Sequence, residues 1–198
     1  MTPEEIGARL VDALGGESGA AGAVTVGESA GGGRFARATV DVPPECWTVA
    51  VLAARTELAC DFFDWLSAVD ELPGGFTIVV HLWSLTLHHH VLLRTRIPRD
   101  AAVLPTLIGV FKGASWHERE THEMFDIDFT GHANLTPLLL PPEFEGHPLR
   151  KEFVLASRVA KPWPGAKEPG ESEHTVSKRA PMRPPGVPDP NEWPGGHS

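Results

Sequence analysis

Hydrophobic positions recur with two different periods along this chain, and each period predicts a different kind of element. Near the N-terminus the apolar residues recur at every fourth position: Ile6, Leu10 and Leu14. Thr2 and Glu5 form a capping-box pattern with a proline between them, and Gly15-Gly16 favours a helix end. The sequence therefore predicts an N-terminal helix, followed by a glycine-rich linker up to residue 33.

The next segments carry first a strand-like period and then a helix-like one. Residues 35–42 alternate and stop at Pro43-Pro44, which predicts a strand, and residues 47–52 predict a second short strand. From Leu58 to Val69 the apolar residues recur at helical spacing. We therefore expect an amphipathic helix that ends near residue 70.

Two apolar, β-branched runs follow, with a short polar connection between them. They span residues 76–87 and 90–97, and a Pro-Gly-Gly turn precedes them, so we expect an antiparallel pair of strands. The pattern of residues 104–115 is ambiguous between helix and strand, and we expect this segment to begin a layer of helices. Residues 116–125 are rich in Glu, Arg and Met and predict a helix.

Prolines dominate the C-terminal part of the chain and prevent a continuous helix there. Four of them stand at positions 137, 141, 142 and 148, so we expect an extended segment over residues 131–155, which we call the strap. Residues 156–198 are proline-rich, lack periodicity and are expected to be disordered when alone.

The order of these elements predicts the domain organisation and the fold class. An N-terminal helix and linker cover residues 1–33, a core domain covers residues 34–130, and the strap and the tail follow. Strands that pair locally and helices that segregate are typical of an α+β fold. We expect a two-layer domain with a mixed or antiparallel sheet packed on helices, followed by the extended proline-rich strap.

Charge and cysteine content exclude several classes of protein. The 198 residues carry a net charge of −9, which argues against broad binding to nucleic acids or anionic membranes. Cys46 and Cys60 are the only thiols, too few for a conventional iron–sulfur cluster, and their apolar surroundings predict burial in a reducing compartment. Neither a secretory signal nor a membrane-spanning stretch is visible, so contact with a membrane would require a partner.

Ten histidines invite a metal site, but their spacing does not support one. In the run from His88 to His90 only the first and third side chains would share a strand face, and we expect exposed turn histidines. His117 and His122 are five positions apart, whereas the zinc-binding helix motif needs four. A stand-alone metal enzyme using these histidines is therefore the least favoured hypothesis.

Three carboxylates lie within six residues of the predicted helix over 116–125: Glu118, Glu120 and Glu123. They form either a solvated acidic face or a face that binds a basic partner. A catalytic acid–base pair would need opposed environments in a pocket, which the sequence does not indicate. Phosphate-binding loops, dinucleotide fingerprints and nucleophile elbows are absent from the sequence.

The six tryptophans divide into two groups by their position in the sequence. Four lie in the predicted core domain and are expected to fill its interior: Trp47, Trp65, Trp83 and Trp116. Trp163 and Trp193 lie in the tail, where they are candidate anchors for a pocket of another protein.

The densest mixed motif lies in the strap, from Glu145 to Phe153. Gly146 permits a sharp turn, and Pro148 forces the preceding His147 into extended geometry. Leu149 can enter an apolar pocket, while Arg150 can bind a carboxylate through two hydrogen bonds, with Lys151 beside it. An extended segment with an apolar anchor and a planar cation is a recognition element rather than a nucleophile–base pair.

Several of these blocks resemble one known family in the same order. One part of the sequence resembles, in register, a block of the 30-kilodalton subunit of respiratory complex I, which is the C component of NADH–quinone oxidoreductase. The matching residues are Trp116 to Glu120, Met124-Phe125, Ile127, Phe129, Gly131 and His132. Residues 138–141 and 145–153 resemble its two later motifs, and residues 63–70 and 76–85 resemble two earlier ones. The sequence departs from the family at His122-Glu123, at Asp126 and at Thr136-Pro137, where two arginines are missing.

The resemblance implies a peripheral-arm subunit with no catalytic, cofactor-binding or metal-binding residues of its own. NADH, FMN, iron–sulfur clusters and quinone would be bound by other subunits of the complex. The implied partners are the large (49-kilodalton, D) subunit and neighbouring iron–sulfur subunits, on the cytoplasmic face of the cell membrane. An equivalent subunit of a membrane-bound hydrogenase or a ferredoxin-linked relative of complex I is the alternative.

The resemblance also implies which residues touch the large subunit. They come from the acidic helix and from the strap: Glu118, Arg119, Glu120, His132, Glu145, Gly146, His147, Pro148, Leu149, Arg150 and Lys151. The strap would be the docking element, and the helix would lie beside it.

Overall fold

The computed structural model describes residues 1–17, 24–27 and 36–154. Residues 18–23, 28–35 and 155–198 lie outside the described part of the chain, and with them lie the predicted tail, Trp163 and Trp193. All described residues belong to one compact unit, Met1–Ala156.

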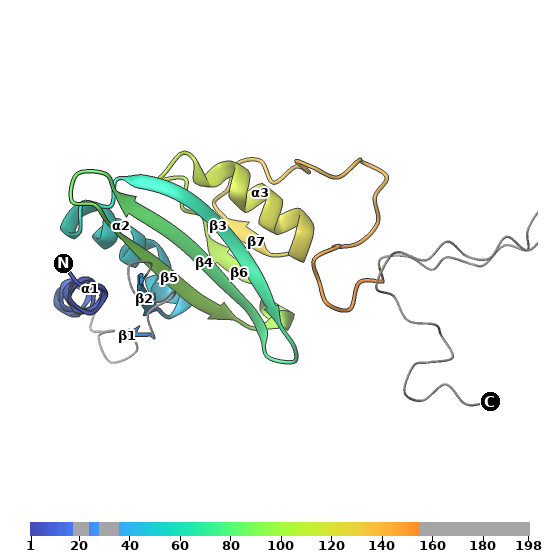
Figure 1. The fold of residues 1–198 in the computed structure, drawn as a ribbon. Coiled ribbons are helices and arrows are strands. Elements are labelled where there is room, and N and C mark those ends of the chain that lie inside the picture. The colour runs from blue at the N-terminus through green and yellow to red at the C-terminus, as the bar shows by residue number, and fades with distance from the viewer. Residues whose placement is uncertain (18–23, 28–35, 155–198) are drawn as a thin grey trace, which may run out of the picture. The chain divides into compact units, whose positions relative to one another are not determined.

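A mixed sheet of five strands forms one layer, in the order β1-β2-β5-β4-β3 (Figure 1). The strands are β1 (Thr25–Val26), β2 (Ala38–Asp41), β3 (Phe62–Glu71), β4 (Gly75–Ser84) and β5 (His89–Ile97). Only β2 and β5 run parallel, and the other neighbours in this described sheet are antiparallel. The α+β fold with a mixed sheet is therefore confirmed, as is the antiparallel pair that the two apolar runs predicted.

Helices form the second layer, and a small parallel sheet completes it. The helices are α1 (Pro3–Glu17), α2 (Trp47–Glu57) and α3 (Ala114–Phe125), with short 3-10 turns η2 (Pro44–Cys46) and η3 (Arg99–Ala101). The small sheet pairs β6 (Val103–Pro105) with β7 (Asp128–Thr130). Helices α2 and α3 lie on one face of the large sheet, and α1 packs on α2 and β2. The other face of β3, β4 and β5 is turned toward the viewer in Figure 1, with no helix of the described chain over it.

The predicted N-terminal capping box is present. The backbone N–H of Thr2 donates to the Glu5 carboxylate at 2.8 Å, and the N–H of Glu5 donates to the Thr2 hydroxyl at 3.3 Å. The apolar stripe of α1 is buried in the core, as its spacing predicted. The helix runs past the two glycines to Glu17, so the end predicted at Gly15-Gly16 was too early.

Two segments adopt the opposite structure from the one their patterns predicted. Residues 47–57 form a helix rather than a strand, because the run contains three alanines, the best helix formers, and carries one buried stripe. Residues 62–71 form a strand rather than a helix, because Leu66, Ala68 and Asp70 alternate into the core while Trp65, Ser67 and Val69 face outward. The helical spacing in that segment was coincidental.

Candidate interaction surface

The strap packs on α3 of its own chain. Between residues 131 and 154 it forms turns and bends but no helix or strand, as the prolines predicted. It runs along α3 and then loops beyond the C-terminal end of that helix (Figure 1). Hydrogen bonds with side chains and backbone carbonyl groups of α3 hold it there.

Glu123 supplies the central contact. Its carboxylate accepts three successive backbone N–H groups of the strap, from Leu138 at 2.9 Å, Leu139 at 2.8 Å and Leu140 at 3.3 Å. Successive N–H groups aimed at one anion form a nest, which is a favourable site for a charge. Glu123 is buried, so the expectation of a solvated acidic face is wrong at this position. Its backbone carbonyl also faces Nδ1 of His147 at 2.9 Å.

Two arginines bind acceptor groups of their own chain, mainly backbone carbonyl oxygens. Arg119 donates to the carbonyl oxygens of Thr136 and Pro137, each at 2.8 Å. Arg150 donates from Nε to the carbonyl oxygen of Phe125 at 2.7 Å and from a terminal nitrogen to Asp126 at 3.1 Å. A cation at the C-terminus of a helix is stabilised by the helix dipole. Both arginines therefore fix the strap on α3.

Glu118 lies on the opposite, inner side of α3 and has no exposed surface. Its carboxylate accepts the backbone N–H of Leu107 at 2.6 Å and the hydroxyl of Thr106. Burial raises the pKa of Glu118 above its ordinary value, while these two hydrogen bonds and the nearby His132 oppose the shift. The expectation of a solvated carboxylate is wrong here too, because Glu118 ties α3 to the loop after β6.

Asp70 joins the end of the strap to the sheet. Its buried carboxylate accepts the Lys151 backbone N–H at 2.8 Å and pairs with Arg99. Arg99 also reaches Glu152 at 2.8 Å and lies over the Phe76 ring at 4.7 Å. These contacts hold the end of the strap against β3 and β4.

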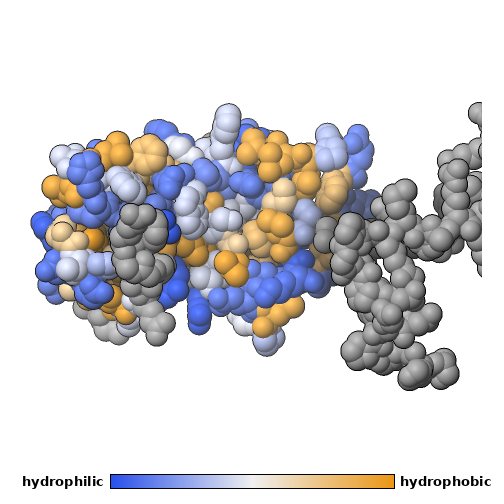
Figure 2. Space-filling view, in the orientation of Figure 1, coloured by the Kyte–Doolittle hydropathy of each residue, from blue (hydrophilic) through white to orange (hydrophobic). Residues whose placement is uncertain are grey.

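The outer side of α3 and the strap carries exposed apolar side chains. Trp116 is 68% exposed, so its predicted place in the core is wrong. Further along the strap Leu139 is 60% exposed and Leu149 52% exposed. In Figure 2 apolar residues lie at this end of the described chain as well as elsewhere on the face in view. A hollow of about 150 Å³ lies between helix and strap, and it is lined by His122, Leu135, Leu140, Phe144 and His147 among others.

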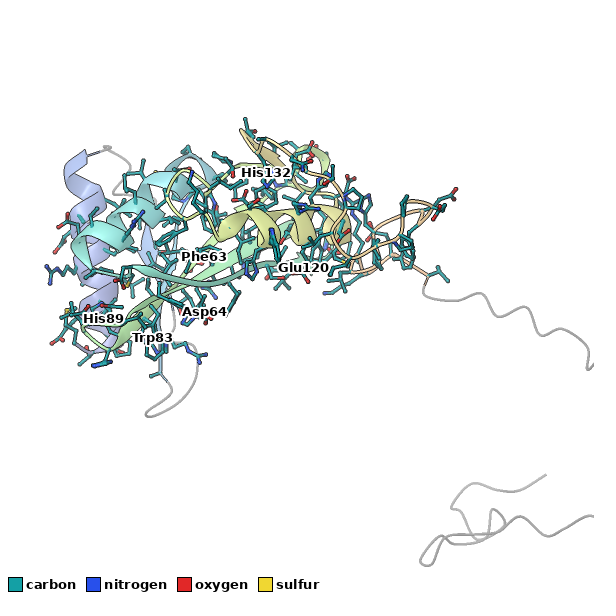
Figure 3. The ribbon with its side chains drawn as sticks, turned by 90° about the horizontal axis from the view of Figure 1, so that it is seen from above. Phe63, Asp64, Trp83, His89, Glu120 and His132 are labelled. Carbon is teal, nitrogen blue, oxygen red and sulfur yellow. The ribbon has the colours of Figure 1, made fainter. Side chains whose placement is uncertain are left out.

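The remaining predicted interface residues lie at or near the surface. Glu120, labelled on α3 in Figure 3, is half-buried, and His132 binds the carbonyl oxygen of Ser115 at 3.2 Å. The others are exposed or half-buried: Glu145, Gly146, Pro148 and Lys151. Their contact with a partner stays a prediction.

The histidines and cysteines behave partly as expected. His117 packs on Phe63 with ring centroids 5.4 Å apart, while Nδ1 of His122 faces the carbonyl oxygen of Ile127, so the two do not converge. His89 is buried and binds the carbonyl oxygen of Leu58 at 2.8 Å, so the expectation of exposed turn histidines is wrong for this residue. Cys46 and Cys60 are free and buried, as predicted.

The described residues offer neither a metal site nor a membrane span. They contain no group of three or more His, Cys, Asp or Glu side chains arranged to hold a metal ion. None of the helices in the described ranges is both long enough and apolar enough to span a bilayer.

Sequence reasoning missed three residues that organise this surface: Asp70, Glu123 and Trp116. Asp70 stands in phase with the buried positions of β3, so a period of two would have indicated a buried carboxylate. The role of Glu123 has no local signal, because its partners lie 15 to 17 residues away. The exposure of Trp116 depends on which face of α3 meets the sheet.

Comparison with known proteins gives consistent results. Residues 40–159 match the family model described as respiratory-chain NADH dehydrogenase, 30 Kd subunit. The C component of NADH-quinone oxidoreductase from a Roseiflexus species is 41% identical over 103 residues, which are 51% of this chain and 59% of that protein. The C/D component from Pseudomonas fluorescens is 44% identical over 84 residues, which are 41% of this chain and 14% of that protein. The chain thus spans only part of these relatives.

Solved structures share the fold. A chain in an archaeal membrane-bound sulfane sulfur reductase, a respiratory membrane complex, superposes with a TM-score of 0.60 at 26% identity, covering 77% of this chain and 85% of that one. A trypsin-resistant fragment of Nqo5 gives 0.52 at 22% identity, covering 63% of this chain and 98% of the fragment. The family model matches more than half of the chain. This chain therefore belongs to the family of respiratory-chain NADH dehydrogenase 30 Kd subunits.

Proposed function

We propose that this chain is a non-catalytic peripheral-arm subunit of a proton-pumping NADH–quinone oxidoreductase, and that it packs on the large (D) subunit. Electron transfer from NADH to quinone is then a property of the whole complex. The chain supports assembly through the surface formed by α3 and the strap. It is held at the cytoplasmic face of the membrane by its partners.

The single observation that carries this proposal is the exposed Trp116 beside an ordered strap. Tryptophans are enriched among the residues that dominate binding energy at protein interfaces. Leu139 and Leu149 are further exposed apolar side chains on the strap, and the hollow between helix and strap can receive one side chain of a partner. Because the strap is already fastened to α3, a partner has less chain to order on binding, which favours affinity.

The names of the relatives favour the large subunit as that partner. In Pseudomonas fluorescens and other bacteria the matching segment belongs to a longer protein that is named for both components, C/D, and it forms 14% of that protein. A covalent link keeps two parts of one chain at high effective concentration. We infer that the C-like and D-like parts are neighbours in the assembly of this chain as well.

The proposal places every cofactor of the complex outside this chain. NADH, FMN, iron–sulfur clusters and quinone are assigned to other subunits, including the neighbouring iron–sulfur subunits. Both cysteines of this chain are buried in its core, where a thiol acts as a small apolar side chain.

A second candidate is the equivalent subunit of a ferredoxin-linked or hydrogenase-type relative. The likeness to a chain of the archaeal sulfane sulfur reductase favours it, since the fold is shared with a respiratory membrane complex that is not named as an NADH–quinone oxidoreductase. The identity of the partner subunits distinguishes the two candidates.

Co-purification with the large subunit of the same organism tests the proposal. Trp116→Ala should weaken the complex at least about 10-fold, as truncation of an interface hot spot does. Leu85→Ala is the matched control, because Leu85 is also exposed but lies in the turn after β4. Equal affinity of both variants and the wild type would exclude the α3 and strap surface as the docking site.

A further inference from the structure

The face of the large sheet that no helix of the described residues covers contains a row of hydrogen-bonded side chains that the proposed function does not use. It begins at an irregularity in edge strand β3. Phe63 is paired with Leu82 and Trp65 with His81, which leaves Asp64 as an extra residue between two pairs. A bulge of this kind re-aims a side chain. Figure 3 shows Asp64 and Trp83 on the side of the sheet away from α3, whereas Phe63 points toward the helix.

Three side chains from three adjacent strands then form a line. His81 is only 4% exposed, and its Nδ1 lies 2.7 Å from Oδ2 of Asp64. Its other nitrogen, Nε2, lies 3.0 Å from Nδ1 of His90. Trp65 stacks on the His81 ring at 5.9 Å, and Trp83 contacts the His90 ring at 4.7 Å. Each imidazole ring of the pair therefore has one indole ring packed against it.

These contacts determine where the ring hydrogens lie. An ionised carboxylate only accepts hydrogen bonds, so Nδ1 of His81 carries a hydrogen. In the neutral ring Nε2 of His81 is then an acceptor, and Nδ1 of His90 must donate to it. Nε2 of a neutral His90 is left with a free electron pair. His90 is half-buried, so this nitrogen is the outer end of the line.

We propose that Asp64, His81 and His90 form a one-proton uptake site on the face of the sheet that is turned away from α3. A proton from solvent binds Nε2 of His90, the hydrogen on Nδ1 of His90 passes to Nε2 of His81, and the positive charge rests on His81 against Asp64. Each ring nitrogen that loses a hydrogen faces one that gains it, so the atoms balance. The step needs no side-chain rotation, and the face gains one positive charge.

The surrounding charges direct the proton inward. Burial lowers the pKa of His90, and the nearby His81, Arg37 and His89 lower it further, while Asp64 acts in the opposite direction. These groups come from β3, β4, β5 and the residue before β2. A lasting charge on His90 is therefore disfavoured, whereas a charge on His81 is paired directly with the Asp64 carboxylate at 2.7 Å.

Nitrogen-15 NMR of the histidine rings tests the proposal on the unmodified chain. At alkaline pH we expect both rings to be neutral with the hydrogen on Nδ1. Acidification through the usual histidine range, about pH 8 to 5, should make His81 the imidazolium while His90 changes to the Nε2–H form. An imidazolium on His90 with a neutral His81, or rings that do not change in this range, would overturn the proposal.

A pair of variants adds a second test. Asp64→Asn removes the charge that stabilises protonated His81, so the midpoint of uptake should fall by about one pH unit or more. Asp61→Asn is the control, because Asp61 is an exposed carboxylate just before β3 and has no contact with the two rings. Equal shifts in both variants would show that His81 responds only to the general charge of the chain. Should Asp64→Asn not fold, the NMR titration of the unmodified chain still decides.

Discussion

Nε of Arg150 donates a hydrogen bond of 2.7 Å to the carbonyl oxygen of Phe125, the last residue of α3. The most basic part of the strap is thus used to close the C-terminus of a helix in the same chain. The backbone N–H of Leu149 adds a second bond there, to the carbonyl oxygen of Met124 at 3.2 Å. What the strap offers to a partner is therefore its apolar outer side, held in one shape by polar contacts on its inner side.

Glu123→Gln should loosen the strap without unfolding the sheet. The amide has one oxygen for three N–H donors and brings its own N–H₂ toward them, so about 1–3 kcal/mol of local stability should be lost. Limited proteolysis between residues 131 and 154, and amide exchange at residues 138–140, would measure the change. Glu120→Gln is the control, since Glu120 makes no hydrogen bond within the described ranges. Unchanged exchange in Glu123→Gln would contradict the role assigned to the nest.

Asp70→Asn should destabilise the domain far more than Glu71→Gln on the next residue. Asp70 is buried against Arg99, and breaking such a pair costs about 3–5 kcal/mol. Glu71 pairs with the exposed Arg96 at 3.4 Å, and surface pairs contribute about 0–1 kcal/mol. Urea unfolding of both variants measures the difference. Similar midpoints would indicate that the Arg99 pair adds little to the fold.

Glu118→Gln should change how stability depends on pH. Burial raises the pKa of Glu118 in the folded chain, so the folded state binds this proton more tightly than the unfolded one. The stabilisation from this more tightly bound proton is complete below the pKa that Glu118 has in the unfolded chain. It is lost as the pH rises through the pKa that Glu118 has in the folded chain. The stability of the wild type relative to Glu118→Gln should therefore fall from about pH 4 toward neutrality.

Unfolding experiments across this range check that prediction. Gln can keep both contacts, because its oxygen accepts the N–H of Leu107 and its N–H₂ can donate to the Thr106 hydroxyl, which reverses the direction of that hydrogen bond. Glu57→Gln is the control, because Glu57 is an exposed carboxylate at the end of α2. A difference that stays constant with pH, or rises, would contradict the expected sign.

Cys60 should resist alkylation in the folded chain. Burial, with a smaller effect of Asp61, raises the pKa of the Cys60 thiol to about 12. Since the thiolate is the reactive form, a rise of about three units lowers the fraction of reactive thiolate at pH 8 about 1000-fold, and burial further restricts access to it. Iodoacetamide labelling followed by mass spectrometry should detect modification of Cys60 only after denaturant is added. Rapid labelling of the native chain would show that this part of the core opens.

Local signals in the sequence were sufficient for some elements and misleading for others. The capping box at Thr2 and Glu5 predicted the start of α1, because both partners of each hydrogen bond lie within three residues. Leu58 to Val69 satisfied helical spacing but contains most of β3, because a short run with many apolar positions fits either period. Pairing with β4 along the whole strand settled the outcome. Tertiary contacts override weak local preferences in this way.

Composition and motifs in a fixed order were enough to predict the α+β class, the antiparallel pair, the absence of a helix from the strap, the buried cysteines and the family. The direction in which each side chain points depended instead on packing in three dimensions. Glu118 and Glu123 are five residues apart on one helix, yet Glu118 accepts a hydrogen bond from the loop after β6, whereas Glu123 binds the strap. Trp116 differs from Trp47 in the same way, since one faces solvent and the other the core. Helical spacing gives relative directions around an axis, and only packing against the sheet and the strap assigns those directions to solvent, core or partner.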